Sequence, residues 1–128
     1  MTRVLLVFVG GGVGSVLRYL TVLAAVRFVT PSFPVGTLVV NLVGCFFIGF
    51  VHNLAMQTTR ISPDARLFLT TGVMGGLTTY SAFNYETLSL VEQGQLAQAI
   101  GYGLAMVIGC IAAGLLGTWS AQAVVASG

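Results

Sequence analysis

The chain has 128 residues, and its composition excludes a soluble globular domain. Charged residues make up 6% of the sequence and hydrophobic residues 56%, whereas soluble domains carry about 25% charged residues. The net charge of +2 is too small to indicate nucleic-acid binding. We therefore expect lipid to be the solvent for most of this chain.

Four apolar stretches are each long enough to cross a bilayer, which takes about 20 residues. They cover residues 4–29, 35–56, 66–91 and 96–125, and segments with proline, aspartate or glycine separate them. No cleavage site followed by a soluble domain comes after the first stretch, so we do not interpret it as a signal peptide. The sequence predicts an all-α membrane protein with one four-helix transmembrane domain over residues 1–128.

Small residues and an arginine mark the first stretch. Gly10 and Gly14 are four residues apart and share a helix face, which favours close packing within the chain or between copies. Arg18 follows one turn later. It fits three roles: snorkelling to an interface, pairing with Glu86, or providing positive potential at the mouth of an anion pathway.

The second stretch carries Thr37 and Asn41, which are four residues apart on one helix face. A lone asparagine in a membrane most often makes a hydrogen bond between helices, but beside a second polar segment it also fits a pore lining. Cys45 in this stretch and Cys110 in the fourth have no CxxC spacing and no nearby histidine. We expect small helix-facing or lipid-facing residues there, not a metal site or disulfide.

The third stretch contains the polar segment "GGLTTYSAFNYE", residues 75–86. The adjacent glycines Gly75 and Gly76 predict a helix break within Gly75–Thr79. Irregular backbone at membrane depth persists only where protein buries it or where it lines a wet cavity. The carbonyl oxygens that a break releases are hard ligands suited to a small cation. The hydroxyl groups of Thr78, Thr79 and Ser81 would lie beside that break.

The same segment contains an aromatic pair. Tyr80 and Phe83 are three residues apart; such pairs usually pack together, although the positive edge of a ring can also meet an anion.

Catalytic groups are scarce in the chain as a whole. The acidic residues Asp64, Glu86 and Glu92 are scattered, without a nucleophile and base at a catalytic spacing. We therefore do not expect an enzyme.

The charges predict only a weak preference for one orientation in the membrane. With four spans, both termini lie on one side of the membrane. Arg3, Arg60 and Arg66 lie on that side and are offset by Asp64, while Arg27 and Glu92 lie on the other. Because this positive-inside bias is small, insertion in both orientations is feasible. Four helices hardly enclose a polar pathway alone, so we expect a homo-oligomer.

Three segments resemble the Fluc (also called CrcB) fluoride channels. "GGLTTYSAF" is similar to the family signature GGLTTFSTF, and "GTLVVNLVGCFFIG" at residues 36–49 is similar to the second helix with its GTLxxN core. "GGGVGSVLRY" at residues 10–19 resembles the glycine-rich first helix and its arginine. The resemblance covers nearly the whole chain. Tyr80 and Ala82 depart from it, because the family usually has Phe and Thr there.

The resemblance implies an antiparallel, dual-topology homodimer with two pores in the bacterial cytoplasmic (inner) membrane. It implies passive, selective export of fluoride, which relieves fluoride toxicity. It also implies a structural Na⁺ at the dimer centre, held by the backbone carbonyls of Gly75 and Thr78. The fluoride pore residues it implies are Asn41, Tyr80, Phe83, Ser81, Thr37 and Thr79, with Arg18 supplying vestibule electrostatics. The phenol at position 80 is expected to leave the fold intact and to alter conduction.

Two other classes of membrane protein are alternatives. A small multidrug-type exporter also has four short helices and dual topology, but it needs a carboxylate in the first helix, where this chain has Arg18. Glu86 is the one carboxylate expected inside the membrane. A scaffold that transports nothing would explain the glycines but not the polar break.

Overall fold

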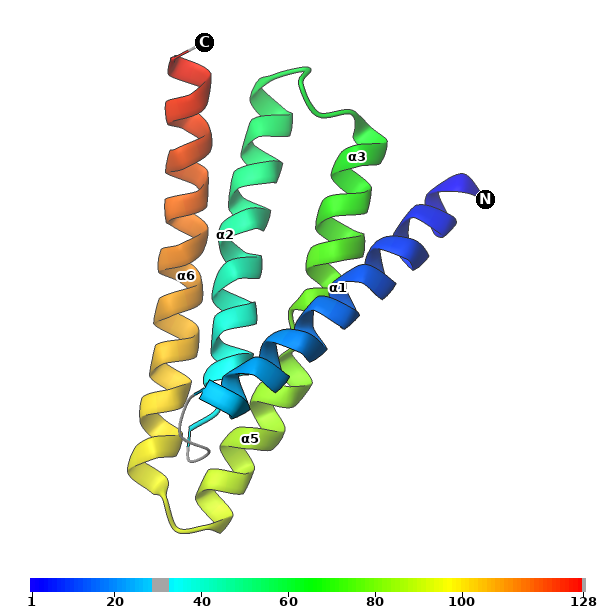
Figure 1. Ribbon diagram of the computed structural model, residues 1–128. Helices are drawn as coiled ribbons and strands as arrows, with labels where there is room; N and C mark the ends of the chain where they lie inside the picture. Colours follow the sequence, from blue (N-terminus) through cyan, green and yellow to red (C-terminus); the bar gives the residue numbers. More distant parts are fainter. Residues whose placement is uncertain (29–32, 128) are drawn as a thin grey trace.

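The computed structural model describes residues 1–28 and 33–127, and every regular element within them is helical. Figure 1 shows the helices as a bundle with both termini at the same end. The elements are α1 (Thr2–Phe28), α2 (Val35–Gln57), α3 (Pro63–Leu67), the π-helix η1 (Phe68–Met74), α4 (Gly75–Leu77), α5 (Tyr80–Glu92) and α6 (Leu96–Ala126). The expected end of the first stretch at Val29 and the turn residue Pro31 lie outside the described residues.

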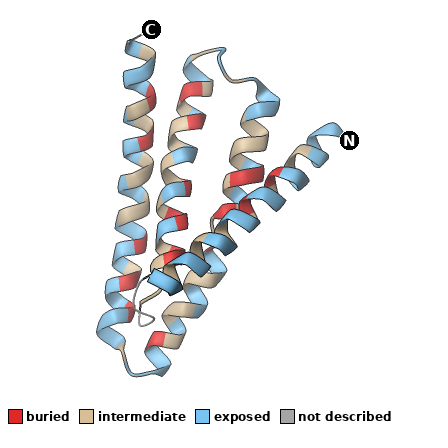
Figure 2. Cartoon of the chain, in the orientation of Figure 1, coloured by how far each residue is buried: buried red, intermediate tan, exposed pale blue. Residues whose placement is uncertain are grey.

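Helices α1, α2 and α6 are long and apolar enough to cross a membrane. Their outer faces carry large apolar side chains in contact with the surroundings, and Figure 2 shows that most of α1 is exposed on the single chain. Exposure of this apolar surface to water would be unfavourable, whereas in a bilayer it contacts acyl chains or another protein. The chain is therefore a multi-pass membrane protein.

The remaining passage along the bundle consists of α3, η1, α4 and α5 in succession (Figure 1). It starts at a local capping motif, because the Ser62 hydroxyl accepts a hydrogen bond from the Ala65 amide at 3.1 Å and Pro63 occupies the first helical position. At the same end of the bundle, Arg3 and Asp64 form an exposed ion pair at 3.2 Å. That pair connects the start of α1 to the start of this passage.

The passage is interrupted at Thr78 and Thr79, whose backbone is extended, with φ/ψ of −81°/154° and −155°/117°. This break lies within the predicted window Gly75–Thr79, but its expected start at the two glycines is wrong. Gly75 has helical angles of −62° and −37°, and α4 continues beyond it. Gly76 instead allows α4 to lie close to α1, because a Cβ on Gly76 would collide with the Gly11 carbonyl.

Close packing of glycines also holds α1 against the interrupted passage. Gly10 and Gly14 are the buried residues of α1. A Cβ on Gly10 would lie 2.9 Å from the Phe68 carbonyl oxygen, and one on Gly14 would collide with the Val73 carbonyl. The GxxxG pair is therefore used within the chain, where it lets two backbones approach closely.

The core lies between α2, α5 and α6. Helices α2 and α6 pack along most of their length, and the buried positions of α6 in Figure 2 lie on its side toward α2. Leu90 on α5 packs with Ala99, Tyr102 and Met106 on α6. Tyr102 is completely buried, and its hydroxyl therefore needs a hydrogen-bond partner. That requirement connects the core to the polar groups described next.

Candidate functional site: a polar helix break

Asn41 on α2 closes the break by pairing with the backbone of Thr79. Its Nδ2 donates to the Thr79 carbonyl at 3.1 Å, and the Thr79 amide donates to Asn41 Oδ1 at 2.8 Å. Asn41 is 7% exposed, so the Thr79 amide would otherwise lie unpaired in an apolar interior, at a cost of about 1–3 kcal/mol. The Thr79 carbonyl, as the N-cap carbonyl of α5, gains a second donor in Asn41 Nδ2. One side chain thus replaces the hydrogen bond that the Thr79 amide would make in a continuous helix.

Asn41 also has a second, softer acceptor. Its Nδ2 donates to the thioether sulfur of Met106 on α6 at 3.4 Å. A thioether is a weak acceptor compared with a carbonyl oxygen. The amide group of Asn41 therefore makes two strong hydrogen bonds to Thr79 and one weak hydrogen bond that a better acceptor could displace.

The hydroxyl of Thr79 starts α5. Its Oγ1 accepts from the Ala82 amide at 3.2 Å, as an N-cap does, and it lies 3.2 Å from the hydroxyl of Ser81. Ser81 itself is exposed on the surface of the single chain. The two hydroxyls therefore form a polar connection between the buried Thr79 and the exposed Ser81.

Arg18 reaches the same break from α1. Its guanidinium donates to the Thr78 carbonyl at 3.3 Å, while the Thr78 hydroxyl donates to the Met74 carbonyl at 2.9 Å. Of the roles open to Arg18 from the sequence, pairing with Glu86 is not the contact that forms. Its positive charge is instead placed beside carbonyl groups at the centre of the bundle, where it compensates their exposed negative ends.

A second polar cluster surrounds Glu86, farther along α5. Thr37 donates to Glu86 Oε1 and Tyr102 donates to Oε2, each at 2.7 Å. Thr37 and Tyr102 are buried, and these hydroxyl-to-carboxylate bonds are short and charge-assisted. The carboxylate therefore fixes the direction of two hydroxyls, one from α2 and one from α6.

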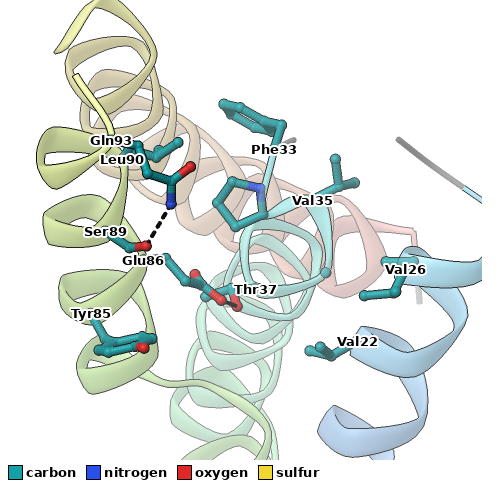
Figure 3. A pocket seen from close by; sticks show the side chains of 13 residues that line it. Val22, Val26, Phe33, Val35, Thr37, Tyr85, Glu86, Ser89, Leu90 and Gln93 are labelled. Atoms are coloured by element: carbon teal, nitrogen blue, oxygen red, sulfur yellow. Dashed lines mark hydrogen bonds between the residues drawn. The ribbon is translucent and has the colours of Figure 1, made fainter. Parts of the chain in front are cut away.

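Glu86 also faces an open cavity of about 280 Å³. Figure 3 shows Thr37 and Glu86 side by side in it, with Tyr85 and Ser89 on the α5 side and Val22 and Val26 of α1 opposite. A carboxylate at the wall of an open cavity between helices is a polar entrance toward the buried cluster.

Aromatic rings lie side by side from the protein surface to the core. Tyr80 and Phe83 meet edge to face with centroids 5.6 Å apart, and Phe83 meets Tyr102 at 5.2 Å. Phe33 is on the other side of Tyr102, at 5.3 Å. Tyr80 is 78% exposed on the single chain. The pair predicted from the sequence therefore makes contact, and its outer member points away from this chain's own core.

The structure brings the predicted site residues into two neighbouring clusters. Asn41, Thr79 and Ser81 meet at the break, together with the Thr78 carbonyl. Thr37 belongs instead to the cluster of Glu86 and Tyr102. Sequence reasoning did not assign these last two residues to the site. Glu86 carried a signal, namely a carboxylate at membrane depth, but the pairing of Tyr102 depends on how α5 and α6 align.

These features define a class: a helical, multi-pass membrane protein with a polar break at the centre of its bundle. The chain belongs to the CrcB family, because residues 5–118 match the family described as "CrcB-like protein, Camphor Resistance (CrcB)". With its apolar helices and its bacterial relatives, it is a multi-pass protein of the bacterial inner membrane.

Relatives of known name align over nearly the full chain. A protein of Anaeromyxobacter dehalogenans is 54% identical over 118 residues, which are 92% of this chain and 94% of the relative. One from Chlorobaculum tepidum is 50% identical, covering 90% of this chain and 87% of its own. One from Mesorhizobium japonicum is 46% identical, covering 95% and 98%. Each is named "Fluoride-specific ion channel FluC".

Proposed function

We propose that this protein is a passive, fluoride-selective channel that exports fluoride across the bacterial inner membrane and so relieves fluoride toxicity. The observation that carries the proposal is the shared name of relatives that are 46–54% identical over at least nine-tenths of this chain. The polar break and its neighbouring aromatic rings support it physically. They offer neutral hydrogen-bond donors and ring edges at membrane depth, which suit a small anion.

Fluoride must exchange its tightly held water for donors of the protein along the route. Asn41 supplies one, because fluoride is a far better acceptor than the Met106 sulfur that Nδ2 contacts at 3.4 Å. The Ser81 hydroxyl supplies another nearer the surface, and Thr79 and Thr37 lie behind them. The edges of Tyr80 and Phe83 supply weak attraction, which lets the ion move on. Arg18 adds positive potential at the break.

The carboxylate of Glu86 repels a free anion, so its role in this proposal is indirect. It accepts from Thr37 and Tyr102 at 2.7 Å each, and it thereby holds both hydroxyls in fixed directions beside the cavity. With these donors committed, fluoride does not bind so tightly at the entrance that it fails to proceed.

A second copy of the chain, inserted in the opposite orientation, completes two pores in this proposal. Tyr80 and Ser81 are exposed on the single chain and need another wall to form an enclosed path. The small arginine bias supports insertion both ways. A protein with Cys45 and Cys110 replaced by Ser and with Ser127→Cys tests this in spheroplasts. An impermeant thiol reagent should label about half of the chains from outside, and permeabilising the membrane should expose the other half. Labelling of all chains or of none before permeabilisation would contradict dual topology.

The break also has carbonyl groups that fit the structural Na⁺ expected at the dimer centre. A continuous helix would donate the Thr79 amide to the Gly75 carbonyl, but that amide donates to Asn41 instead. Gly75 is exposed on the single chain, and the Thr78 carbonyl is shared with Arg18. Such neutral oxygens suit a hard cation. With Gly75 and Thr78 from each copy, the ion would join the two breaks.

The alternative classes explain less of the site. An exporter of cationic drugs needs an accessible membrane carboxylate in its first helix, where this chain has Arg18. Glu86 lies in the third passage and already accepts two hydroxyl groups. A scaffold would not require the polar break. Because the sequence has no nucleophile and base at a catalytic spacing, we propose transport, not catalysis, for this chain.

The test is release of fluoride from liposomes loaded with KF, with valinomycin present to carry the compensating K⁺. We expect rapid release of fluoride and no release of chloride from matched KCl liposomes. Asn41→Ala removes a donor and the closure of the break, and Phe83→Ile removes a ring edge. Asn41→Ala should slow release about tenfold, as the loss of one good hydrogen bond does. Phe83→Ile should slow it by a smaller factor, because a ring edge attracts an anion more weakly than an amide does.

The fold of each variant is checked by gel filtration, so that slow release is not confused with misfolding. Absence of fluoride release from well-folded protein, including its Tyr80→Phe form, would contradict the channel. Movement of protons driven by a gradient of a cationic drug would favour the exporter instead.

A further inference from the structure

Three sulfur atoms lie together between α2 and α6. The Cys110 thiol donates to the thioether of Met106, one turn earlier on α6, at 3.8 Å. Asn41 of α2 contacts Met106 of α6, and Cys45 and Cys110 each lie one turn further along these two helices, so they face each other; the Cys45 carbonyl lies 3.7 Å from where a Cβ on Gly114 of α6 would be. Met106 is 6% exposed and both cysteines are half-buried. The two cysteines of the chain, 65 positions apart in sequence, are therefore neighbours in the fold.

We propose that Cys45, Cys110 and Met106 form a binding site for one soft divalent metal ion such as Hg(II). Thiolate and thioether sulfur select soft, thiophilic metals over Mg²⁺ or Ca²⁺. In the part of the chain that the structure describes, no three His, Cys, Asp or Glu side chains gather as a metal site. The thioether is therefore what turns this cysteine pair into a three-sulfur site.

Charge favours a divalent over a monovalent ion here. Two thiolates cancel the charge of Hg(II), so the complex adds no net charge to the low-dielectric interior, where an uncompensated charge is costly. The reaction with HgCl₂ is a substitution: two S–H bonds break, two Hg–S bonds form, and two HCl leave. No electron is transferred. Neutral HgCl₂ also crosses lipid to reach half-buried thiols.

The metal site shares an atom with the polar break. The same Met106 sulfur that would bind the metal accepts a hydrogen bond from Asn41 Nδ2 at 3.4 Å. Coordination occupies one of the two lone pairs of the sulfur, and the two thiolates cross-link α2 to α6 one turn from Asn41. Resting on the proposed function, this cross-link restrains Asn41 from adjusting to fluoride, and the metal is predicted to slow fluoride release about tenfold, the effect of one lost hydrogen bond.

Metal binding is measured on the purified protein without reference to transport. We expect one Hg per chain, loss of both free thiols, and a near-ultraviolet sulfur-to-mercury absorption band. The concentration of a competing monothiol that removes the bound Hg(II) measures how strongly the two protein thiols chelate it. A single Cys45→Ser or Cys110→Ser variant should release the metal at about a hundredfold lower competitor concentration, because the second thiol acts at high effective concentration. Met106→Leu should keep the stoichiometry and bind more weakly.

Several results would overturn the site. Two Hg per wild-type chain would mean that the thiols react separately. Equal retention by either single serine variant would remove the chelate, and unchanged affinity of Met106→Leu would remove the third ligand. Serine is nearly isosteric with cysteine, and gel filtration verifies that the variants remain folded.

The transport arm uses the same proteins in KF-loaded liposomes. HgCl₂ should slow release by the wild type, a soluble dithiol should restore it, and the Cys45→Ser/Cys110→Ser protein should not respond. Unchanged release from metal-loaded wild type would overturn the coupling to the break. If the untreated protein releases no fluoride, the proposed function fails, while the stoichiometry still decides the metal site.

Discussion

Asn41 closes the helix break, and this structural role is compatible with the transport role proposed for it. Its carboxamide accepts from the Thr79 amide, which the break would otherwise leave unpaired, and donates to the Thr79 carbonyl. The same Nδ2 makes a weak contact with a sulfur atom. Structural closure thus uses the two strong hydrogen bonds to Thr79, and the weak contact with sulfur is the one that an anion would displace in the proposed path. The two roles that the sequence left open for Asn41 are compatible.

Tyr80 is the residue in which this chain departs most clearly from the channel signature. Its ring contacts Phe83 at 5.6 Å and its surface is otherwise exposed. A phenol O–H on the path gives fluoride an extra donor and holds it longer. We expect Tyr80→Phe to speed fluoride release about fivefold, as one hydrogen bond of about 1 kcal/mol would. Equal release rates from liposomes at equal protein density would refute this role of the hydroxyl.

Glu86 is expected to stabilise the fold through its two buried hydroxyl partners. In Glu86→Gln the amide nitrogen cannot accept a hydrogen bond, so the charge-assisted pairs with Thr37 and Tyr102 are weakened. The free energy of unfolding in detergent should fall by about 1–3 kcal/mol. Glu92→Gln, at the exposed end of α5, is the matched control and should change it by less than about 0.5 kcal/mol. Equal effects would show that the network contributes little.

The packing of α1 depends on backbone contact. Its exposed side meets lipid or protein, so it is held on the interrupted passage by glycines whose missing side chains let helices touch. This also explains why Gly76 lies in a helical segment beside the break and not in the break itself. The extended residues are Thr78 and Thr79, where Asn41 provides the replacement hydrogen bonds.

Two alanine substitutions in α1 separate packing from helix propensity. Both Gly12→Ala and Gly14→Ala gain about 1 kcal/mol of helix propensity. A Cβ at Gly12 meets nothing within 4 Å, whereas one at Gly14 collides with the Val73 carbonyl. We expect Gly14→Ala to lower the free energy of unfolding by about 1–3 kcal/mol, as overpacking does, and Gly12→Ala not to lower it. Equal stability of the two variants in chemical unfolding would contradict the close approach.

The path proposed above is enclosed only when a second chain covers its open side. A single chain leaves Tyr80, Ser81 and Gly75 on its surface. These are the groups that the proposed pore and cation site need a second copy to cover. The exposed apolar face of α1 supplies surface for lipid and for such a partner.

Removal of Na⁺ should weaken assembly without unfolding the chain. If carbonyls of two copies share the ion, replacing Na⁺ by N-methylglucamine removes a ligand that binds only the dimer. We expect the dimer dissociation constant in detergent to rise about tenfold or more, measured by light scattering after dilution, while helix content stays constant. An unchanged dissociation constant would argue against a shared cation at Gly75 and Thr78.

The sequence by itself determined the features that depend on local composition. The low charge and long apolar stretches require lipid, and the polar segment after residue 75 locates an interruption within one passage. Glycine spacing indicated close helix contacts. The position of the break within its window was not determined, because Gly75 can be helical as readily as extended and because Gly11, which Gly76 contacts, is far away in sequence.

Only the tertiary structure decided which groups pair across helices. Asn41 meets Thr79 and Met106, and Glu86 meets Tyr102. Each pairing depends on how far one helix is shifted and rotated relative to another. Periodicity within one helix identifies a shared face but carries no information on that alignment, which is set by side-chain packing between α2, α5 and α6.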